Sequence, residues 1–129
     1  MKTRLAIPVW RETVSTVFDF SQSLLLIDTQ GNREISRREV SLPDEPAPQR
    51  ASRLDRLGVQ VLVCGAISQS LARFVTQSDI LLVPFVSGPI DEVLAAYLCG
   101  RLADFRFLQP GSPPAARRRW RRGRGPRGQ

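Results

Sequence analysis

The chain has 129 residues, of which 42% are hydrophobic, and this size and composition are typical of one small folded domain. Its formal net charge of +7 comes from seven arginines beyond residue 110, because residues 1–110 carry twelve basic and twelve acidic side chains. The absence of histidine excludes Ser-His-Asp and Cys-His nucleophiles, histidine acid–base catalysis and histidine metal ligands. We therefore expect a neutral folded domain, residues 1–110, and a disordered basic tail, residues 111–129.

The cysteine content and the apolar runs indicate the compartment. The two cysteines, Cys64 and Cys99, do not form a CxxC motif. The longest apolar run, residues 80–86, is far shorter than a membrane-spanning segment and is interrupted by a proline. The apolar residues 5–10 run straight into Arg11 and are too few for a signal peptide. We expect a cytoplasmic protein without membrane contact, whose thiols stay reduced.

The first half of the chain predicts three antiparallel strands. Apolar runs and alternation place them at residues 2–10, 23–28 and 33–42. An irregular loop rich in Thr, Ser and Val is expected at residues 11–20, and Gly31 suits the hairpin turn between the second and third strands. The third strand is expected at a half-exposed edge, with Ile35 and Val40 as its apolar members.

The second half predicts two strands and three helices. The strands are expected at residues 59–64 and 80–86, and the helices at residues 48–57, 68–77 and 89–99. Ser68 is the expected N-cap of the second helix, and Gly100 ends the third. The side chains expected to face the core follow the helical repeat: Ala51, Leu54, Leu57, Ile67, Leu71, Phe74, Val75, Ile90, Val93, Leu94, Tyr97 and Leu98.

This order of elements predicts a ribonuclease H-like, three-layer α/β fold. The two later strands are each followed by a helix and must run parallel, so we expect a five-stranded mixed sheet of order 3-2-1-4-5. Open sheets of this kind bind ligands beyond the carboxyl ends of their strands. Here those ends lead into two glycine turns, residues 64–66 and 87–89, which form the candidate site.

Three separated segments then show a resemblance to a known family. Residues 2–9 (KTRLAIPV), 63–68 (VCGAIS) and 84–98 (PFVSGPIDEVLAAYL) resemble the dinitrogenase iron–molybdenum cofactor biosynthesis family, the NifX-type cofactor carriers. The resemblance extends over about residues 2–108. It implies a ribonuclease H-like fold and a role in binding or shuttling an iron–sulfur or iron–molybdenum cluster precursor. Cofactor-assembly proteins would be the partners.

Three positions depart from the pattern of that family. Residues 17–20 stand where many relatives carry His-Phe-Gly, so no cluster-ligating histidine is expected. Ser87 and Ser112 stand where close relatives often carry cysteine, so two sulfur ligands are replaced by oxygens. Cys64 remains as the one thiol beside the turns.

The resemblance and the glycine turns together predict the site. The residues expected to contact a cofactor are Phe18, Cys64, Gly65, Ala66, Ser87 and Gly88. Cys64 is the candidate metal ligand, because soft thiolates bind iron, although clusters usually need several of them. A homodimer would supply a second thiolate. Burial of Cys64 as a small core residue is the alternative, since cysteine is among the most buried residue types.

The charge distribution leaves a second function open. In residues 117–122 five arginines surround Trp120, which suits weak contact with RNA, DNA or another polyanion through phosphate neutralisation and base stacking. A two-metal nuclease is not expected, because such enzymes need clustered carboxylates and Asp19 and Asp28 stand singly. The alternative to a cofactor carrier is thus a nucleic-acid-associated module that binds through its tail.

Overall fold

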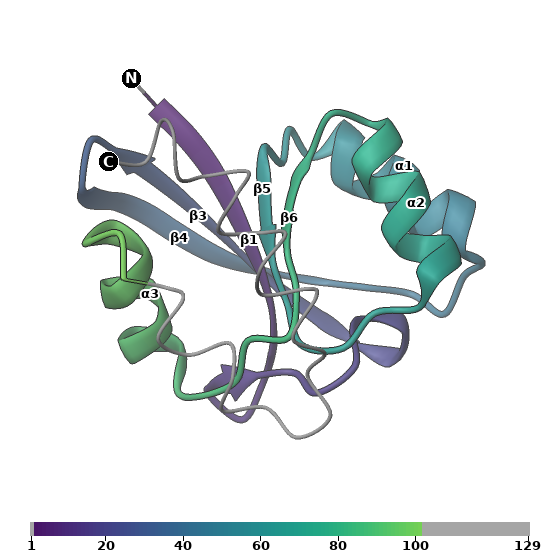
Figure 1. Cartoon of the computed structure of the whole chain (residues 1–129), viewed down its shortest axis with the longest axis horizontal. Coiled ribbons are helices and arrows are strands. Elements are labelled where there is room, and N and C mark those ends of the chain that lie inside the picture. The colour runs from purple at the N-terminus through teal and green to yellow at the C-terminus, as the bar shows by residue number, and fades with distance from the viewer. Residues whose placement is uncertain (1, 102–129) are drawn as a thin grey trace.

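The computed structural model describes residues 2–101, in which four strands precede the first α-helix and each of the last two strands is followed by an α-helix (Figure 1). The strands are β1 (Lys2–Trp10), β2 (Thr13–Val14), β3 (Ser23–Gln30), β4 (Arg33–Ser41), β5 (Val61–Val63) and β6 (Leu81–Val83). The helices are α1 (Ala47–Arg56), α2 (Gln69–Gln77) and α3 (Ile90–Leu98), with the short 3-10 helix η1 (Phe18–Phe20). The chain is therefore of the mixed α/β class.

The strands form one mixed sheet with the order β4-β3-β1-β5-β6, and β2 pairs with the end of β1. The pairs β1–β3 and β3–β4 are antiparallel, and the pairs β1–β5 and β5–β6 are parallel. The predicted count of five strands and the numbered order 3-2-1-4-5 are corrected. The described residues form six strands, because β2 lies within the segment that was expected to be an irregular loop.

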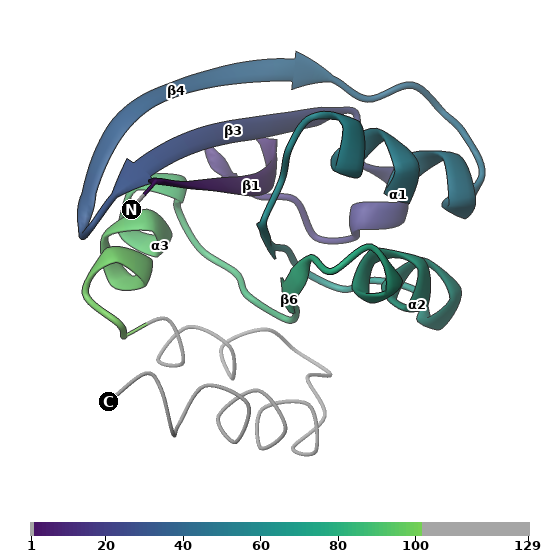
Figure 2. The ribbon, with the colours of Figure 1, turned by 90° about the horizontal axis from the view of Figure 1, so that it is seen from above.

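The helices cover the two faces of this sheet, so the molecule has three layers. Figure 2 shows α1 and α2 lying together, apart from α3. On the α3 face, Leu5 and Ile27 pack with Val93, and all three are fully buried. On the opposite face, Leu62 packs with Leu54 of α1. Alternate residues of the central strands therefore serve two separate apolar cores.

The ends of the helices follow from local hydrogen bonding. The hydroxyl of Ser68 accepts the main-chain N–H of Leu71 at 3.2 Å, which confirms Ser68 as the N-cap of α2. Pro89 directly precedes α3, whose first turn carries Asp91 and Glu92 beside the positive end of the helix dipole. Gly100 follows α3 at φ 75°, a conformation that glycine adopts without strain.

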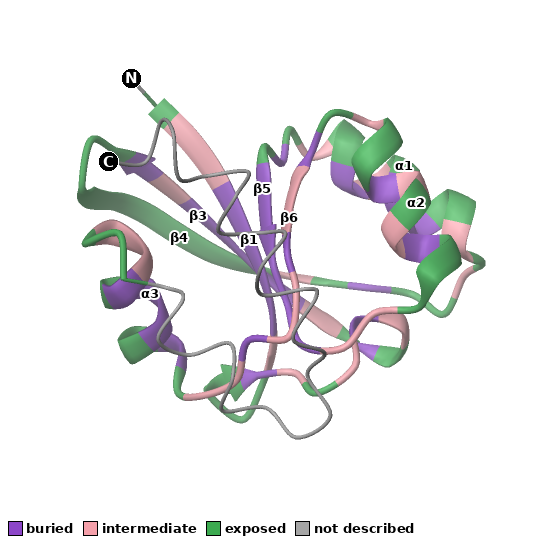
Figure 3. Cartoon of the chain, in the orientation of Figure 1, coloured by how far each residue is buried: buried purple, intermediate pink, exposed green. Residues whose placement is uncertain are grey.

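Strand β4 is an exposed edge of the sheet (Figure 3). Its register against β3 shifts beside Asp28, where Ser36 faces Asp28 and Glu34 faces Thr29. The residue between them, Ile35, is therefore unpaired and 46% exposed, whereas Val40 is half-buried against the α1–α2 face. The bulge explains why only one of the two apolar residues expected on this strand contacts a core.

Two further predictions concern membrane contact and the basic tail. Among residues 2–101, no helix has the length and apolar character needed to cross a membrane. The predicted boundary at residue 110 and the predicted disordered tail, residues 111–129, lie outside the described residues.

Candidate functional site

The two glycine turns lie side by side at the carboxyl ends of β5 and β6. The main-chain N–H of Val86 donates to the carbonyl oxygen of Cys64 at 3.0 Å, and that of Phe85 donates to the carbonyl oxygen of Gly65 at 2.9 Å. These two hydrogen bonds join the turns directly beyond the parallel pairing of β5 with β6, which ends at Val63 and Val83. The turns therefore share one end of the sheet, where ligands of open α/β sheets bind.

Residues 11–20, which we call the strap, cross both turns. At the β6 turn, the N–H of Val14 donates to the carbonyl oxygen of Gly88 at 3.0 Å. At the start of α3, the N–H of Ile90 donates to the carbonyl oxygen of Glu12 at 2.9 Å. Strand β2 thus extends the edge of the site instead of leaving an open loop.

The strap is also paired with the β5 turn. The N–H of Phe18 donates to the carbonyl oxygen of Ala66, and the N–H of Ala66 donates to the carbonyl oxygen of Thr16, both at 2.8 Å. The two hydrogen bonds form a short parallel bridge between Val17 and Ala66. Phe18 is thereby brought next to the glycine turn with which it was grouped from the sequence.

Cys64, at the start of the β5 turn, is fully buried. Its exposed fraction is 0%, and it belongs to the apolar core on the α1–α2 face, together with Phe18, which is also 0% exposed. Gly65 is buried, whereas Ala66 is half-buried. The thiol proposed as a metal ligand therefore lies inside the closed molecule and not on the surface of the crevice.

Ser87 and Gly88 are more accessible. Both are half-buried in the turn that leads from β6 to α3, and Gly88 adopts φ 128°, which strains any other residue. Phe85, two residues earlier, is held at φ 65°, a left-handed conformation that bulky residues rarely adopt. Strained backbone of this kind is concentrated at functional sites, so the β6 turn is the best-supported part of the predicted site.

The amino-terminal end of α2 is already occupied by a group of the protein. The main-chain N–H of Ser68 donates to a carboxylate oxygen of Asp19 at 2.8 Å. Helix amino termini attract anions, and here a strap carboxylate takes one of those hydrogen bonds. A free anion would have to compete with Asp19 for this position.

A buried arginine fixes the far end of the strap, and the sequence pattern did not reveal it. Arg50 of α1 is 2% exposed and donates hydrogen bonds to the carbonyl oxygens of Phe18 (2.8 Å), Ser21 (2.9 Å) and Pro43 (2.7 Å). Its Nε is buried without a hydrogen-bond partner among the described residues. Burial is the largest influence on Arg50 and lowers the pKa of its guanidinium.

The set of metal-binding side chains at this site is small. Among residues 2–101, no three His, Cys, Asp or Glu side chains gather in a way that would hold a metal ion. The second cysteine, Cys99, is exposed just after α3. A resident iron–sulfur cluster held by several thiolates of one chain does not fit these residues.

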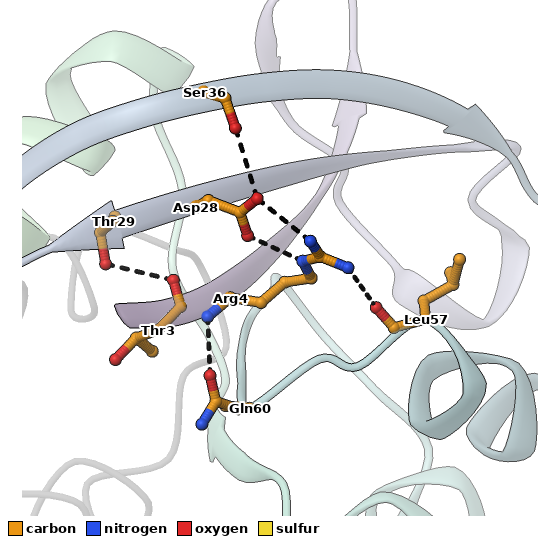
Figure 4. Close-up of polar contacts among 7 residues, drawn as sticks. All are labelled: Thr3, Arg4, Asp28, Thr29, Ser36, Leu57 and Gln60. Carbon is orange, nitrogen blue, oxygen red and sulfur yellow. Dashed lines mark hydrogen bonds and ion pairs between the residues drawn. The ribbon is translucent and has the colours of Figure 1, made fainter. Parts of the chain in front are cut away.

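A polar network lies at the opposite end of the sheet (Figure 4). Arg4 of β1 donates to both carboxylate oxygens of Asp28, at 2.7 and 3.1 Å, and to the carbonyl oxygen of Leu57 at 2.8 Å. A hollow of about 230 Å³ adjoins this network. Because Arg4 and Asp28 satisfy each other there, we interpret the network as structural: it joins β1 to β3 and to the turn after α1.

A second hollow, of about 400 Å³, lies beside η1. Its lining residues come from the strap, from the two residues that follow it, from the segment that leads into α1, and from α1 itself: Asp19, Phe20, Ser21, Gln22, Leu42, Asp44 and Arg50. Phe20 is 81% exposed at this point, one of three large apolar side chains on the described surface. Neither of the two hollows is lined by Cys64 or by the glycine turns.

The fold and the paired turns define an α/β protein with a candidate ligand site at the carboxyl edge of a mixed sheet. Comparison with protein families makes the assignment specific. The model of the family described as dinitrogenase iron-molybdenum cofactor matches residues 1–100, and the chain belongs to this family.

Solved structures show the same fold. The crystal structure of PH0822 superposes with a TM-score of 0.73 at 22% identity, over 77% of this chain and 91% of that chain. A presumed dinitrogenase from Methanocaldococcus jannaschii superposes with a TM-score of 0.65 at 14% identity, over 78% of this chain and 92% of that chain. A presumed NifB protein from Thermotoga superposes with a TM-score of 0.62 at 20% identity, over 77% of this chain and 90% of that chain. No curated relative matches the chain.

Proposed function

We propose that this chain is a non-enzymatic accessory or carrier protein of iron–molybdenum cofactor assembly, built on a ribonuclease H-like fold. Its cargo would be an iron–sulfur or iron–molybdenum cluster precursor. Membership of the family supports the role. The proposed location of the site rests on one observation. The main-chain N–H of Val86 donates a hydrogen bond to the carbonyl oxygen of Cys64, and this bond holds the two glycine turns together at one edge of the sheet.

The residues proposed to contact the cargo have different roles. Cys64 would supply the one thiolate, and Gly65, Ala66 and Gly88 would let main chain approach closely. Ser87 would offer a hydroxyl at the accessible turn. Because one chain provides a single thiol here, binding would be weak and sensitive to oxygen, and a second copy of the chain could add another thiolate.

The proposed partners and location follow from the cargo. A carrier receives its cluster from one assembly protein and delivers it to another, so cofactor-assembly proteins are the proposed partners. Labile clusters need a reducing environment, which agrees with a cytoplasmic location and with two cysteines that are not joined in a disulfide.

Anaerobic reconstitution tests this proposal. The full chain is incubated with ferrous iron and sulfide, desalted without air, and examined by metal analysis and visible absorbance. We expect bound iron in the parent chain and in a Cys99→Ser variant, and loss of most of it in Cys64→Ser. The two variants are matched because each replaces one cysteine that forms no disulfide. Equal iron uptake by Cys64→Ser would remove Cys64 from the site.

The arginine-rich tail supports a second candidate function, contact with nucleic acid. Residues 2–101 carry eleven basic and eleven acidic side chains, so they provide no net positive charge for such contact. Seven arginines follow residue 110. Any affinity for RNA or DNA would therefore depend on residues 111–129, which lie outside the described structure.

A further inference from the structure

The strap accepts hydrogen bonds at the starts of α2 and α3, at the end of the sheet where open α/β sheets bind ligands. A carboxylate oxygen of Asp19 accepts the N–H of Ser68 at the start of α2. The carbonyl oxygen of Glu12 accepts the N–H of Ile90 at the start of α3. Both acceptors come from one ten-residue segment, and between them the main chain of the strap pairs with the β5 turn at Ala66.

We propose that the strap is an autoinhibitory cover, and that its local release is what exposes Cys64. This inference rests on the proposed carrier function, because it explains how cargo reaches a thiol that is fully buried. In the closed state, Phe18 of the strap fills the core that contains Cys64. Withdrawal of Phe18 opens that core from the side of the glycine turns.

Two side chains latch the strap at its carboxyl end. Asp19 ties it to the start of α2 through Ser68. Arg50 ties it to α1 through the carbonyl oxygen of Phe18 and through that of Ser21, the residue directly after the strap. Hydrogen bonds that involve a charged group are stronger than neutral ones, so these contacts contribute most to closure.

The strap can leave without disrupting the main sheet. Its regular structure consists of two residues in β2 and three in η1, whereas β3, β1, β5 and β6 pair with one another without it. The hairpin that begins the strap holds Arg11 at φ 50° and Glu12 at φ 66°, conformations that cost energy in residues other than glycine. Release of the strap exposes the buried side chains of Val14 and Phe18, but it leaves the rest of both cores in place, so it should cost less than the free energy of global unfolding.

Thiol labelling measures this release directly. The full chain with Cys99→Ser leaves Cys64 as its one cysteine, and the chain with Cys64→Ser leaves the exposed Cys99 as the reference. Under native conditions with a thiol-reactive disulfide reagent, we expect Cys64 to react about a hundredfold more slowly than Cys99, because only opened molecules react. Equal rates in the two proteins would show that no cover exists.

Latch variants then separate local release from unfolding. In the Cys99→Ser chain, Asp19→Ala and Arg50→Lys should each accelerate labelling of Cys64 about tenfold, beyond any change in global stability measured by urea unfolding. Asp28→Ala is the matched control, because it removes a carboxylate from an arginine pair at the opposite end of the sheet. It should change labelling only as far as it changes global stability.

The outcomes decide the inference in either direction. If labelling follows global stability in all three variants, the strap does not open by itself and the proposal fails. If one latch variant does not fold, the labelling rate of Cys64 in the Cys99→Ser chain is measured at several low urea concentrations. Local release predicts a rate that is nearly independent of urea in this range, whereas global unfolding predicts a rate that rises with urea. The labelling needs no metal. A strap that opens in a protein that takes up no iron would therefore refute the carrier function alone.

Discussion

The guanidinium of Arg50 donates a 2.8 Å hydrogen bond to the main-chain carbonyl oxygen of Phe18, and the centre of the guanidinium lies 5.5 Å from the centroid of the Phe18 ring. A charged residue of α1 thus holds the most deeply buried aromatic residue of the strap by both its backbone and its ring. Helix and strap are joined through one side chain.

Replacing Arg50 by methionine should lower the free energy of unfolding by about 2–4 kcal/mol, because buried carbonyl oxygens lose their donors. Urea unfolding followed by circular dichroism measures the change. Arg56→Met, at an exposed position in the last turn of the same helix, is the control and should stay within about 0.5 kcal/mol of the parent. Equal effects of the two substitutions would refute the structural role of Arg50.

Replacing Asp79 by glycine should stabilise the protein by about 0.5 kcal/mol. Asp79 is exposed just after α2 at φ 63°, so glycine relieves a left-handed strain that outweighs its greater flexibility in the unfolded chain. Thermal unfolding can detect the shift. Ser52→Gly, at an exposed position inside α1, should instead destabilise by about 0.5 kcal/mol. A loss of stability in both variants contradicts the assigned backbone conformation.

The ion pair between Arg4 and Asp28 should make part of the stability depend on pH. The hydrogen bonds that the Asp28 carboxylate accepts from Arg4 lower the pKa of Asp28 below the ordinary value of 3.8. Because the folded pKa is the lower one, the contribution is complete above the unfolded pKa, from about pH 5 upward, and is lost as the pH falls through the folded pKa.

Comparison of the parent with Asp28→Asn by urea unfolding checks this dependence. We expect the variant to be less stable by about 0.5–1 kcal/mol at pH 7, a size usual for a partly exposed pair, and the difference should shrink at pH 3. A difference that stays constant between these two pH values would show that the carboxylate charge is not what stabilises the sheet there.

Removing residues 111–129 should abolish retention on a single-stranded RNA column and leave iron uptake unchanged. If all seven arginines contact phosphates, log affinity of the full chain should fall with log salt with a slope of about −5. Retention measured at several salt concentrations gives that slope. Retention of RNA by the shortened chain would place the contact on the neutral body, and loss of iron uptake would connect the tail to the cargo.

Much of the fold could be predicted because strong local patterns agreed with the tertiary structure. The apolar run at residues 2–10 became the central strand, and the capping hydroxyl of Ser68 marked the start of α2. Leu71 and Val75 face the core as the helical repeat predicted. Element by element, pattern and packing favoured the same conformation.

The strap could not be predicted in the same way. Strand β2 has two residues and shows no period, and its hairpin turn uses Arg11 and Glu12 where the pattern for positive φ calls for glycine or asparagine. Arg50 resembled an ordinary solvent-facing helix residue, since its partners are main-chain carbonyls that only the folded chain brings together.

The structure brings the two glycine turns of the predicted site together, and it buries Cys64 completely, which was the alternative considered for this residue. Sequence spacing placed Cys64 and Ser87 after neighbouring parallel strands, and the structure pairs those strand ends. Whether a side chain there faces a ligand or the core depends on the packing of the strap. The strap has no periodic sequence pattern from which that packing could be predicted. The metal-binding role of Cys64 stays a prediction.

Strand β4 restricts how two copies of this chain can meet. Its outer edge carries Arg33, Arg37, Arg38 and Glu39, which are all exposed, and charged side chains along a strand discourage main-chain pairing with another sheet. Association of that kind is left to the short strand β6 at the other border. If another copy brought a second thiol by strand pairing, it would therefore arrive from the β6 side, where the glycine turns already lie.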